Sequence, residues 1–218
     1  MELGDVSNFI IEGNAPAAEQ WTQSALDEGM DPLVIVNQGL IPGMDVVGER
    51  FKNGEYYLPE VLVSARAMKY AMNLVRPLLA ETQGASLGKV VIGTVRGDLH
   101  DIGKNLVSMM LDGAGFEVVD LGNDVSPEQF LEAVEESNAN MICMSALLTT
   151  TMPIMKTTIE MLEQSEIRQN LRVMVGGAPV TQHYASDIGA DGYAPDAATA
   201  VDLFKNLASE MKTTSTAG

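Results

Sequence analysis

Beyond residue 88 the sequence alternates short apolar runs, rich in β-branched residues, with longer stretches of helical periodicity. The runs are typical of buried strands, and the stretches between them are typical of amphipathic helices. We expect strands at residues 90–95, 116–121, 140–145, 171–176 and 191–193, and helices at about 103–114, 127–138, 152–167, 181–188 and 196–210. Strands separated by helices of this length need crossover connections, which make the strands parallel and the crossovers right-handed. The sequence therefore predicts a doubly wound, Rossmann-like α/β domain with five parallel strands.

Residues 1–84 carry helical periodicity throughout. We expect a short first helix near residues 6–11, a second from Ala15 to Glu28, a third that begins at Asp31–Pro32, and a fourth that opens with Pro59. The apolar residues of the fourth repeat at spacings of three, four and seven, which gives it one apolar face. Together these helices predict a four-helix bundle. Within the third helix, Pro42–Gly43 predicts a kink.

The helical part and the part with alternating strands and helices meet in Thr82–Gly88. This segment contains mostly small or polar residues and has no apolar period. Such composition is typical of a linker. We therefore predict two domains, a helical cap over residues 1–84 and an α/β domain over residues 89–212. Residues 213–218 are small or polar, which predicts a frayed tail.

The charge of the chain narrows the range of partners. The formal net charge is −17, from 30 acidic and 13 basic residues, so most of the surface would repel a nucleic acid backbone. No apolar run approaches the roughly 18 residues that a membrane span needs, and the N-terminus has no basic-then-apolar signal, so we expect a cytoplasmic location without membrane or nucleic acid contact. The single cysteine, Cys143, lies in an apolar run and is expected to pack as a small hydrophobic residue.

Asp98 and His100 stand on the predicted loop between the first strand and the first helix of the α/β domain. In open α/β sheets such loops lie at the carboxyl ends of the strands, where ligands bind. An Asp two residues before a His can accept the Nδ1–H of the imidazole, which leaves Nε2 free as a metal ligand. Taken alone, the pair also fits a helix cap followed by an ordinary loop histidine.

Three linked motifs favour the metal-binding interpretation. The motifs are Asp98-x-His100-x-x-Gly103, Ser145-x-Leu147 and Gly176-Gly177. Their residues and the distances between them in the sequence resemble the cobalamin-binding module of methionine synthase and of corrinoid-dependent methyltransferase systems. The resemblance extends through the helical half and so covers about residues 5–210. It implies that cobalamin binds with its own lower base displaced and that His100 takes the lower position on cobalt. It further implies a proton relay of His100, Asp98 and a residue with a hydroxyl group. At the position that matches this third residue, the present sequence has Thr151.

The resemblance also implies the residues that contact the cofactor. Small or hydroxyl side chains would admit the nucleotide tail of cobalamin, glycines would let the backbone approach it, and apolar cap residues would shield the upper face of the corrin. The implied contact residues are Gly97, Asp98, His100, Asp101, Ile102, Gly103, Ser145, Leu147, Thr149, Gly176, Gly177, Ala197, Phe51, Leu58 and Val61. The two glycines also fit a tight strand-end turn, and the cap residues also fit an ordinary bundle core.

The function implied by the resemblance is methyl carriage. The corrinoid, as Co(I), would accept a methyl group from a substrate-specific methyltransferase and pass it from methyl-Co(III) to a second methyltransferase that uses tetrahydrofolate or a thiol. A reductive activator is a further expected partner. The alternatives are the small cobalamin-binding subunit of an adenosylcobalamin-dependent mutase, which shares the Asp-x-His-x-x-Gly motif but lacks this cap, and a cobalamin-sensing regulator.

Overall fold

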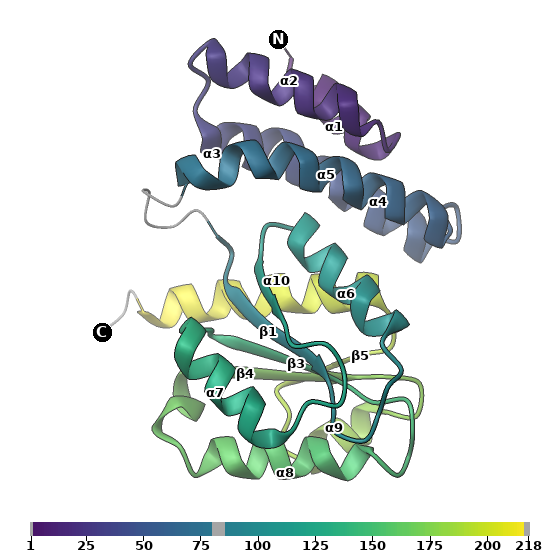
Figure 1. The fold of residues 1–218 in the computed structure, drawn as a ribbon, viewed down its shortest axis with the longest axis vertical. Coiled ribbons are helices and arrows are strands. Elements are labelled where there is room, and N and C mark those ends of the chain that lie inside the picture. The colour runs from purple at the N-terminus through teal and green to yellow at the C-terminus, as the bar shows by residue number, and fades with distance from the viewer. Residues whose placement is uncertain (1, 80–85, 216–218) are drawn as a thin grey trace. The chain divides into compact units, whose positions relative to one another are not determined.

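The computed structural model describes residues 2–79 and 86–215 (Figure 1). The chain separates into two compact units. One contains the residues up to Ser86 together with Met109–Gly115, and the other contains Leu87–Ser108 and the residues from Phe116 onwards. Most of the predicted linker, residues 82–85, lies outside the described residues.

The first unit is helical, as predicted. It contains α1 (Leu3–Ile11), α2 (Ala15–Asp27), α3 (Pro32–Ile35), the π-helix η1 (Val36–Leu40), α4 (Ile41–Lys52) and α5 (Leu58–Leu79). Because α3, η1 and α4 follow one another without a break, the described part of this unit amounts to a four-helix arrangement. Asp31 caps α3 by accepting a hydrogen bond from the Leu33 N–H at 2.8 Å, with Pro32 at the first helical position.

Two glycines allow α1 to lie against the η1–α4 stretch. A Cβ atom on Gly43 would lie 2.9 Å from the Ser7 carbonyl oxygen and 2.9 Å from the Ile10 Cβ, so only glycine fits there without a shift. One turn earlier, the Ser7 hydroxyl donates a 2.6 Å hydrogen bond to the Gly39 carbonyl. Buried Val6 and Ile10 complete the apolar side of this contact.

A helix irregularity stands next to Pro42–Gly43, where the sequence predicts a kink. The irregularity lies one turn earlier, in η1, where the Ile41 N–H donates to the carbonyl of Val36, five residues before it. Proline has no N–H, and its ring crowds the carbonyl four residues earlier, here that of Gln38. The wider π turn relieves this crowding and lets the helix continue through Pro42.

The second unit is a five-stranded parallel sheet in the order β2-β1-β3-β4-β5 within the described ranges. This is the flavodoxin-like order, and it confirms the predicted fold class. The elements are β1 (Lys89–Thr94), α6 (Ile102–Gly113), β2 (Glu117–Asp120), α7 (Pro127–Ser137), β3 (Met141–Ser145), α8 (Met152–Glu163), the 3₁₀-helix η2 (Glu166–Asn170), β4 (Arg172–Gly176), α9 (Gln182–Asp187), β5 (Gly192–Ala194) and α10 (Ala197–Ser215).

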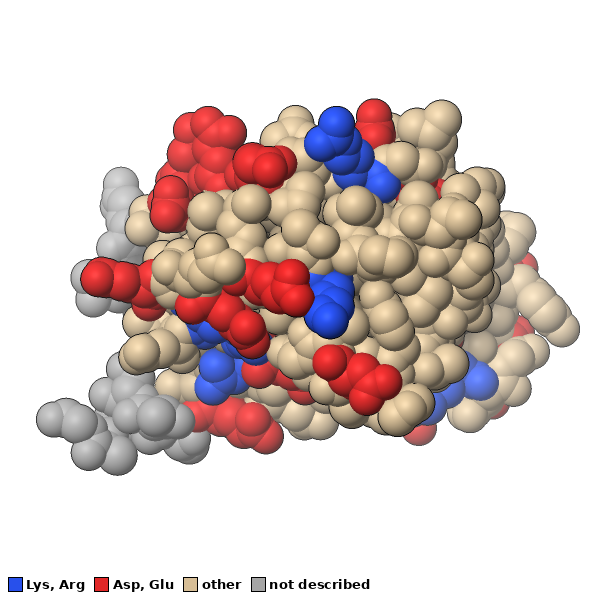
Figure 2. Space-filling model, turned by 90° about the horizontal axis from the view of Figure 1, so that it is seen from below, with Lys and Arg blue, Asp and Glu red and all other residues tan. Residues whose placement is uncertain are grey.

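Helices cover both faces of the sheet (Figure 1). Helices α7, α8 and α9 lie on one face, where Phe130, Ile159 and Ala185 pack against strand residues such as Val91 and Ile142. Helix α10 and residues 102–108 of α6, the part of that helix that belongs to this unit, lie on the other. The face shown in Figure 2 carries several patches of Asp and Glu, with Lys and Arg scattered between them, in keeping with the strongly negative net charge.

Two predicted helix ends differ from the observed ones. The helix expected over 152–167 stops at Glu163, after which the Ser165 hydroxyl donates to the Leu162 carbonyl at 2.6 Å and a 3₁₀ turn follows. The local serine bond satisfies one of the carbonyls that a helix end leaves free. In contrast, α10 continues to Ser215, so residues 213–215 are helical, and the rest of the expected tail lies outside the described residues.

The sheet order contains the topological switch point at which ligands bind in this fold. The chain leaves β1 toward β2 on one side, whereas β3 lies on the other side of β1, so the connections diverge between β1 and β3. Ligands bind at such a switch point, outside the carboxyl ends of the strands. The loops at 95–101 and 146–151 flank this point.

Candidate functional site

The loop that follows β1 begins with a tight turn. The Asp98 N–H donates to the Val95 carbonyl at 3.1 Å, which closes a turn over Val95–Asp98. Gly97 is the third residue of this turn and has a φ of +83°, a value that favours glycine. The Val95 N–H donates to the Ser145 carbonyl at 3.0 Å, so the loop remains attached to β3 where it leaves the sheet.

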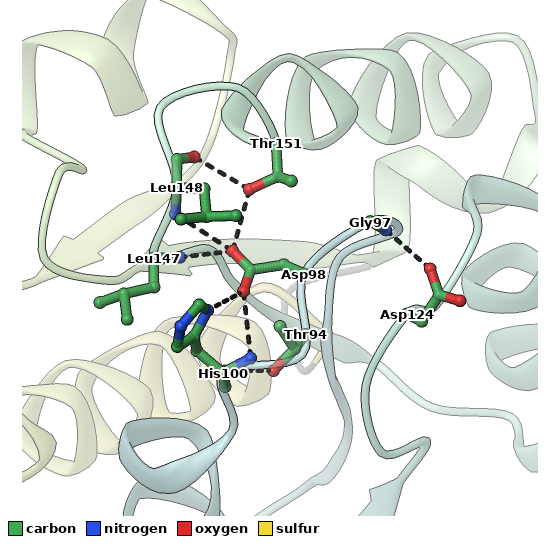
Figure 3. Close-up of polar contacts among 8 residues, drawn as sticks. All are labelled: Thr94, Gly97, Asp98, His100, Asp124, Leu147, Leu148 and Thr151. Atoms are coloured by element: carbon green, nitrogen blue, oxygen red, sulfur yellow. Dashed lines mark hydrogen bonds and ion pairs between the residues drawn. The ribbon is translucent and has the colours of Figure 1, made fainter.

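Asp98 is fully buried, and its carboxylate connects the two loops (Figure 3). Oδ1 accepts hydrogen bonds from His100, at 2.7 Å from the ring Nδ1 and 3.1 Å from the backbone N–H. Oδ2 accepts hydrogen bonds from the backbone N–H groups of Leu147 and Leu148, at 2.7 and 3.1 Å, and from the Thr151 hydroxyl at 2.9 Å. A carboxylate can accept about four hydrogen bonds, so Asp98 is saturated.

These hydrogen bonds keep Asp98 ionised. Burial alone would raise the pKa of its carboxyl. The hydrogen bonds from the Leu147 amide, the ring and amide of His100 and the Thr151 hydroxyl act in the opposite direction and prevail, so the pKa of Asp98 lies well below its ordinary value of 3.8. Asp98 is therefore an acceptor only.

The charge of Asp98 determines the tautomer of His100. Because an ionised carboxylate has no proton to donate, the 2.7 Å contact needs the proton on Nδ1 of His100. In the neutral ring this leaves an unshared pair on Nε2, the form in which imidazole binds a metal. The His100 side chain is 52% exposed, whereas Asp98 beneath it is fully buried. The arrangement orients an imidazole that could bind a metal through Nε2.

Thr151 offers its single hydroxyl proton to two acceptors. Its Oγ1 lies 2.9 Å from Asp98 Oδ2 and 2.9 Å from the Leu148 carbonyl. One proton cannot serve both acceptors fully, so the hydroxyl can strengthen or relax its bond to Asp98 by rotation. The structure thus brings His100, Asp98 and Thr151 into one hydrogen-bonded chain.

The predicted slot residues lie in a row at the carboxyl edge of the sheet. Ser145 pairs with Thr94 on one side and with Gly176 on the other, and Gly176 pairs with Ala194. The row therefore crosses from β1 to β5. It offers small side chains along the edge where a ligand would enter.

Gly177 follows this row in a conformation that only glycine can adopt. Its φ is +123°, and a Cβ atom there would lie 1.8 Å from the Ala146 carbonyl oxygen. Thr149 is exposed on the loop after β3, and Ala197 is buried at the start of α10, next to the end of β5. The structure thus places these residues at the same edge of the sheet as His100.

The surface around His100 is unusually apolar. Leu99 and Ile102, which flank the motif, are 69% and 77% exposed, and Leu147 and Leu148 of the facing loop are also exposed. A Cβ atom on Gly103 would meet nothing within 4 Å, so the backbone there is open to a ligand. A half-exposed histidine close in the chain or across the facing loop to exposed aliphatic side chains would suit a metal held in a large, largely apolar macrocycle. The residues present therefore fit a corrinoid.

The remaining predicted contacts belong to the helical unit. Phe51 is half-buried near the end of α4, Leu58 is exposed at the first position of α5, and Val61 is buried one turn later. Because the two units are separate bodies, each of these residues is placed only within its own unit.

The backbone part of the site is not predictable from the residue types. The amides of Leu147 and Leu148 that hold Asp98 carry no residue-type signal, because every residue except proline has such a group. Asp124, whose side chain accepts a 2.7 Å hydrogen bond from the Gly97 N–H, is a further residue of the site that was not predicted. A signal for Asp124 did exist, since an acidic residue on the loop after β2 must lie beside the loop after its neighbour β1.

Comparisons with known proteins identify B12 binding domains in both parts of the chain. The B12 binding domain family matches residues 88–202, and a second B12 binding domain family matches residues 4–76. A dimethylamine corrinoid protein from Methanosarcina barkeri is 48% identical over 206 residues, which cover 94% of this chain and 96% of the relative. A corrinoid protein from Desulfitobacterium hafniense strain Y51 is 43% identical over 208 residues, with 94% and 96% coverage.

A solved structure extends the similarity to three dimensions. A chain in the crystal structure of the methanol:cobalamin methyltransferase complex from Methanosarcina barkeri has a TM-score of 0.82 and 33% identity, covering 94% of this chain and 78% of that one. The fold and the site define a B12-binding protein. More particularly, the chain belongs to the family of corrinoid proteins, which confirms the resemblance, the fold class and the cofactor predicted from the sequence.

The helices of the structure can be compared with the length and hydropathy that a membrane span needs. Among residues 2–79 and 86–215, no helix combines the length and hydropathy that crossing a bilayer requires.

Proposed function

We propose that the chain carries methyl groups on a bound corrinoid between two methyltransferases. The observation that supports this most directly is the His100 imidazole, whose Nδ1 contacts the buried, ionised Asp98 and whose side chain is 52% exposed. When bound, the corrinoid cobalt supplies the nucleophile that takes up a methyl group and the leaving group that releases it. The chain contributes the axial ligand and its environment.

In this proposal each residue of the hydrogen-bonded chain has a separate task. His100 would hold the cobalt from the lower side through Nε2. Asp98 would keep the Nδ1 proton in place and so maintain the basicity of the ligand. Thr151 would tune Asp98, because its hydroxyl can turn between the carboxylate and the Leu148 carbonyl.

The strand-end row would receive the nucleotide tail of the cofactor. Ser145 and Gly176 offer little bulk at the edge of the sheet, and Gly177 continues the row. Four further residues, Gly97, Asp101, Ile102 and Gly103, would lie under the corrin, and Leu147, Thr149 and Ala197 would lie beside the tail. In the helical unit, Phe51, Leu58 and Val61 would exclude water from the upper face.

The partners are proposed from the relatives. Relatives at 42–48% identity are named as dimethylamine or trimethylamine corrinoid proteins, and the structural neighbour comes from a methanol:cobalamin methyltransferase complex. These names support a substrate-specific methyltransferase as the donor, a second methyltransferase with tetrahydrofolate or a thiol as the acceptor, and a reductive activator. The proposal includes a cytoplasmic location. The mutase alternative is not favoured, because the second B12 binding domain family covers the helical unit.

Two histidine variants test the proposal. Purified protein is mixed with hydroxocobalamin under anaerobic reducing conditions, desalted, and assayed for methyl transfer with a panel of methylamine and methanol methyltransferases. Wild type is expected to retain cobalamin and to accept methyl groups from at least one donor enzyme, and His100→Ala is expected to lose at least tenfold in transfer rate. His183→Ala is the matched control, because His183 is 88% exposed on α9. A colourless wild-type protein after desalting would refute the proposal.

A further inference from the structure

Asp124 lies on the loop between β2 and α7, next to the loop that carries Asp98 and His100 (Figure 3). Its Oδ1 accepts a hydrogen bond from the Gly97 N–H at 2.7 Å. Its own backbone N–H donates to the Asp98 carbonyl at 3.1 Å. The two bonds bracket the Gly97–Asp98 dipeptide, one at each end.

The backbone of Asp124 is adapted to this contact. Asp124 has a φ of +57°, in the left-handed region, where Asp and Asn are tolerated better than most residues. Just after it, the Val125 N–H donates to the Thr94 carbonyl at 3.0 Å, and Val95 and Val125 form a parallel bridge. The loop is thus fixed to the end of β1, and the left-handed turn at Asp124 directs both its amide and its carboxylate toward Gly97–Asp98.

This contact bears on the histidine through Asp98. The Asp98 side chain is buried and bonded to groups of the β3–α8 loop, so its direction depends on where its own backbone lies. The turn over Val95–Asp98 links β1 to the backbone of Asp98. Asp124 contacts this turn on the side opposite the β3–α8 loop (Figure 3). A shift of the turn would therefore change the 2.7 Å contact between Asp98 and the His100 ring.

We propose that Asp124 is a positioning residue, which sets the orientation of Asp98 and thereby the occupancy of the bond between His100 and cobalt. The inference rests on the proposed function, because it assumes His100 as the axial ligand. Asp124 itself touches neither the ring of His100 nor the cofactor in this proposal.

Three substitutions separate the side chain of Asp124 from its backbone conformation. Asp124→Asn keeps an acceptor oxygen and tolerates the left-handed region. Asp124→Gly keeps the backbone freedom and removes the acceptor. Asp124→Ala removes both. Asn123→Ala, at the exposed neighbouring position, is the control.

The first readout uses the protein without cofactor. Nitrogen-15 NMR reports which ring nitrogen of His100 carries the proton. We expect the Nδ1–H tautomer to dominate in wild type, Asp124→Asn and Asn123→Ala, and to lose part of its excess in Asp124→Gly. A general loss of stability would not change this tautomer balance at temperatures well below unfolding.

The second readout is the electron spin resonance spectrum of the cobalt(II) form. We expect the ratio of histidine-bound to histidine-free cobalt to fall about fivefold in Asp124→Gly, the change that loss of one ordinary hydrogen bond produces. Asp124→Asn should restore the wild-type ratio. Should Asp124→Ala fail to fold, Asp124→Gly still decides the question, because it imposes no backbone strain.

The possible results distinguish the inference from the proposed function. If wild type shows the histidine-derived nitrogen splitting and Asp124→Gly shows the same ratio and tautomer balance, the inference is wrong and the proposed function stands. If wild type lacks the splitting, His100 is not the ligand and both are overturned.

Discussion

At the scale of single residues, Asp98 shows how burial can be reconciled with charge. A buried carboxylate without partners would become protonated, but here backbone amides, a hydroxyl and an imidazole all donate to it. The charge is what fixes the proton on Nδ1 of His100. The tautomer of the half-exposed His100 is therefore set by a residue that is fully buried.

Replacing this charge tests its importance for the protein without cofactor. In Asp98→Asn the side-chain NH₂ would replace one carboxylate oxygen. It would then face the donors of Leu147 and Thr151 in one orientation, or those of His100 in the other. In both orientations buried donors lose their acceptor. We expect the free energy of unfolding, measured by urea denaturation, to fall by about 2 kcal/mol.

The matched control is Asp187→Asn, which alters the exposed pair of His183 and Asp187 on α9. Exposed ion pairs contribute little, so this change should stay within about 0.5 kcal/mol. Equal effects of the two substitutions would contradict the importance assigned to Asp98.

Cys143 illustrates a buried group without a chemical task. Burial raises the pKa of its thiol to about 12, although the nearby positive charge of Lys104 acts in the lowering direction. Above the ordinary thiol pKa of 9.0, Cys143 therefore stays protonated in the folded protein but ionises in the unfolded chain. Stability from this source is fully present below pH 9 and is lost as the pH rises toward 12.

A difference measurement isolates this effect from other titrating groups. Between about pH 8 and pH 10, wild type should lose roughly 1 kcal/mol more unfolding free energy than Cys143→Ala, as measured by urea denaturation of both proteins at both pH values. Parallel losses would show that the thiol ionises equally in both states.

At the scale of elements, the strands and crossover helices were predictable, because apolar β-branched runs and helical periods differ strongly in this half of the chain. The finer breaks were not. The π turn at Val36–Leu40 depends on how the ring of Pro42 crowds the preceding turn, and the end of α8 at Glu163 depends on a local serine bond. Neither changes the period of the sequence.

The site was predictable in its side chains through the family resemblance, but not in its backbone contacts. The motif with Asp98, His100 and Gly103 identifies the loop, and Thr151 follows from a matching position. The amides of Leu147 and Leu148, and the left-handed conformation of Asp124, depend on how three loops meet at the carboxyl edge of the sheet. Only the three-dimensional arrangement reveals them.

Two glycines of the site are expected to behave differently when replaced by alanine. Gly177→Ala places a methyl group 1.8 Å from the Ala146 carbonyl oxygen at a φ of +123°, so it should lower the unfolding free energy by roughly 3 kcal/mol or more. Gly103→Ala meets open space at the start of α6 and should leave that free energy within about 0.5 kcal/mol.

Although Gly103→Ala should hardly change the stability of the protein, it should weaken cobalamin binding. Because the open backbone there would lie under the corrin, Gly103→Ala should weaken cobalamin binding about tenfold, equivalent to roughly 1.4 kcal/mol. Measured by spectroscopic titration of the folded variant, unchanged affinity would argue against a corrin at this position.

At the scale of the whole molecule, the chain combines a helical unit with an α/β unit, and B12 binding domain families match both. The sequence predicted this combination because the helical period gives way to the β–α alternation near residue 88. The division at residues 84 and 89 stays a prediction. The net charge of −17 would favour association with basic surfaces over acidic ones.

The proposed function depends most on the bond between Nε2 of His100 and the cobalt of the cofactor. Selective labelling of the histidines with nitrogen-15, followed by electron spin resonance of the cobalt(II) form, tests this bond directly. If His100 is the ligand, the label changes the number of nitrogen lines in each cobalt component, and this change disappears in His100→Ala. If the cofactor keeps its own lower base, the pattern is the same with and without the label, and the assignment of His100 is contradicted.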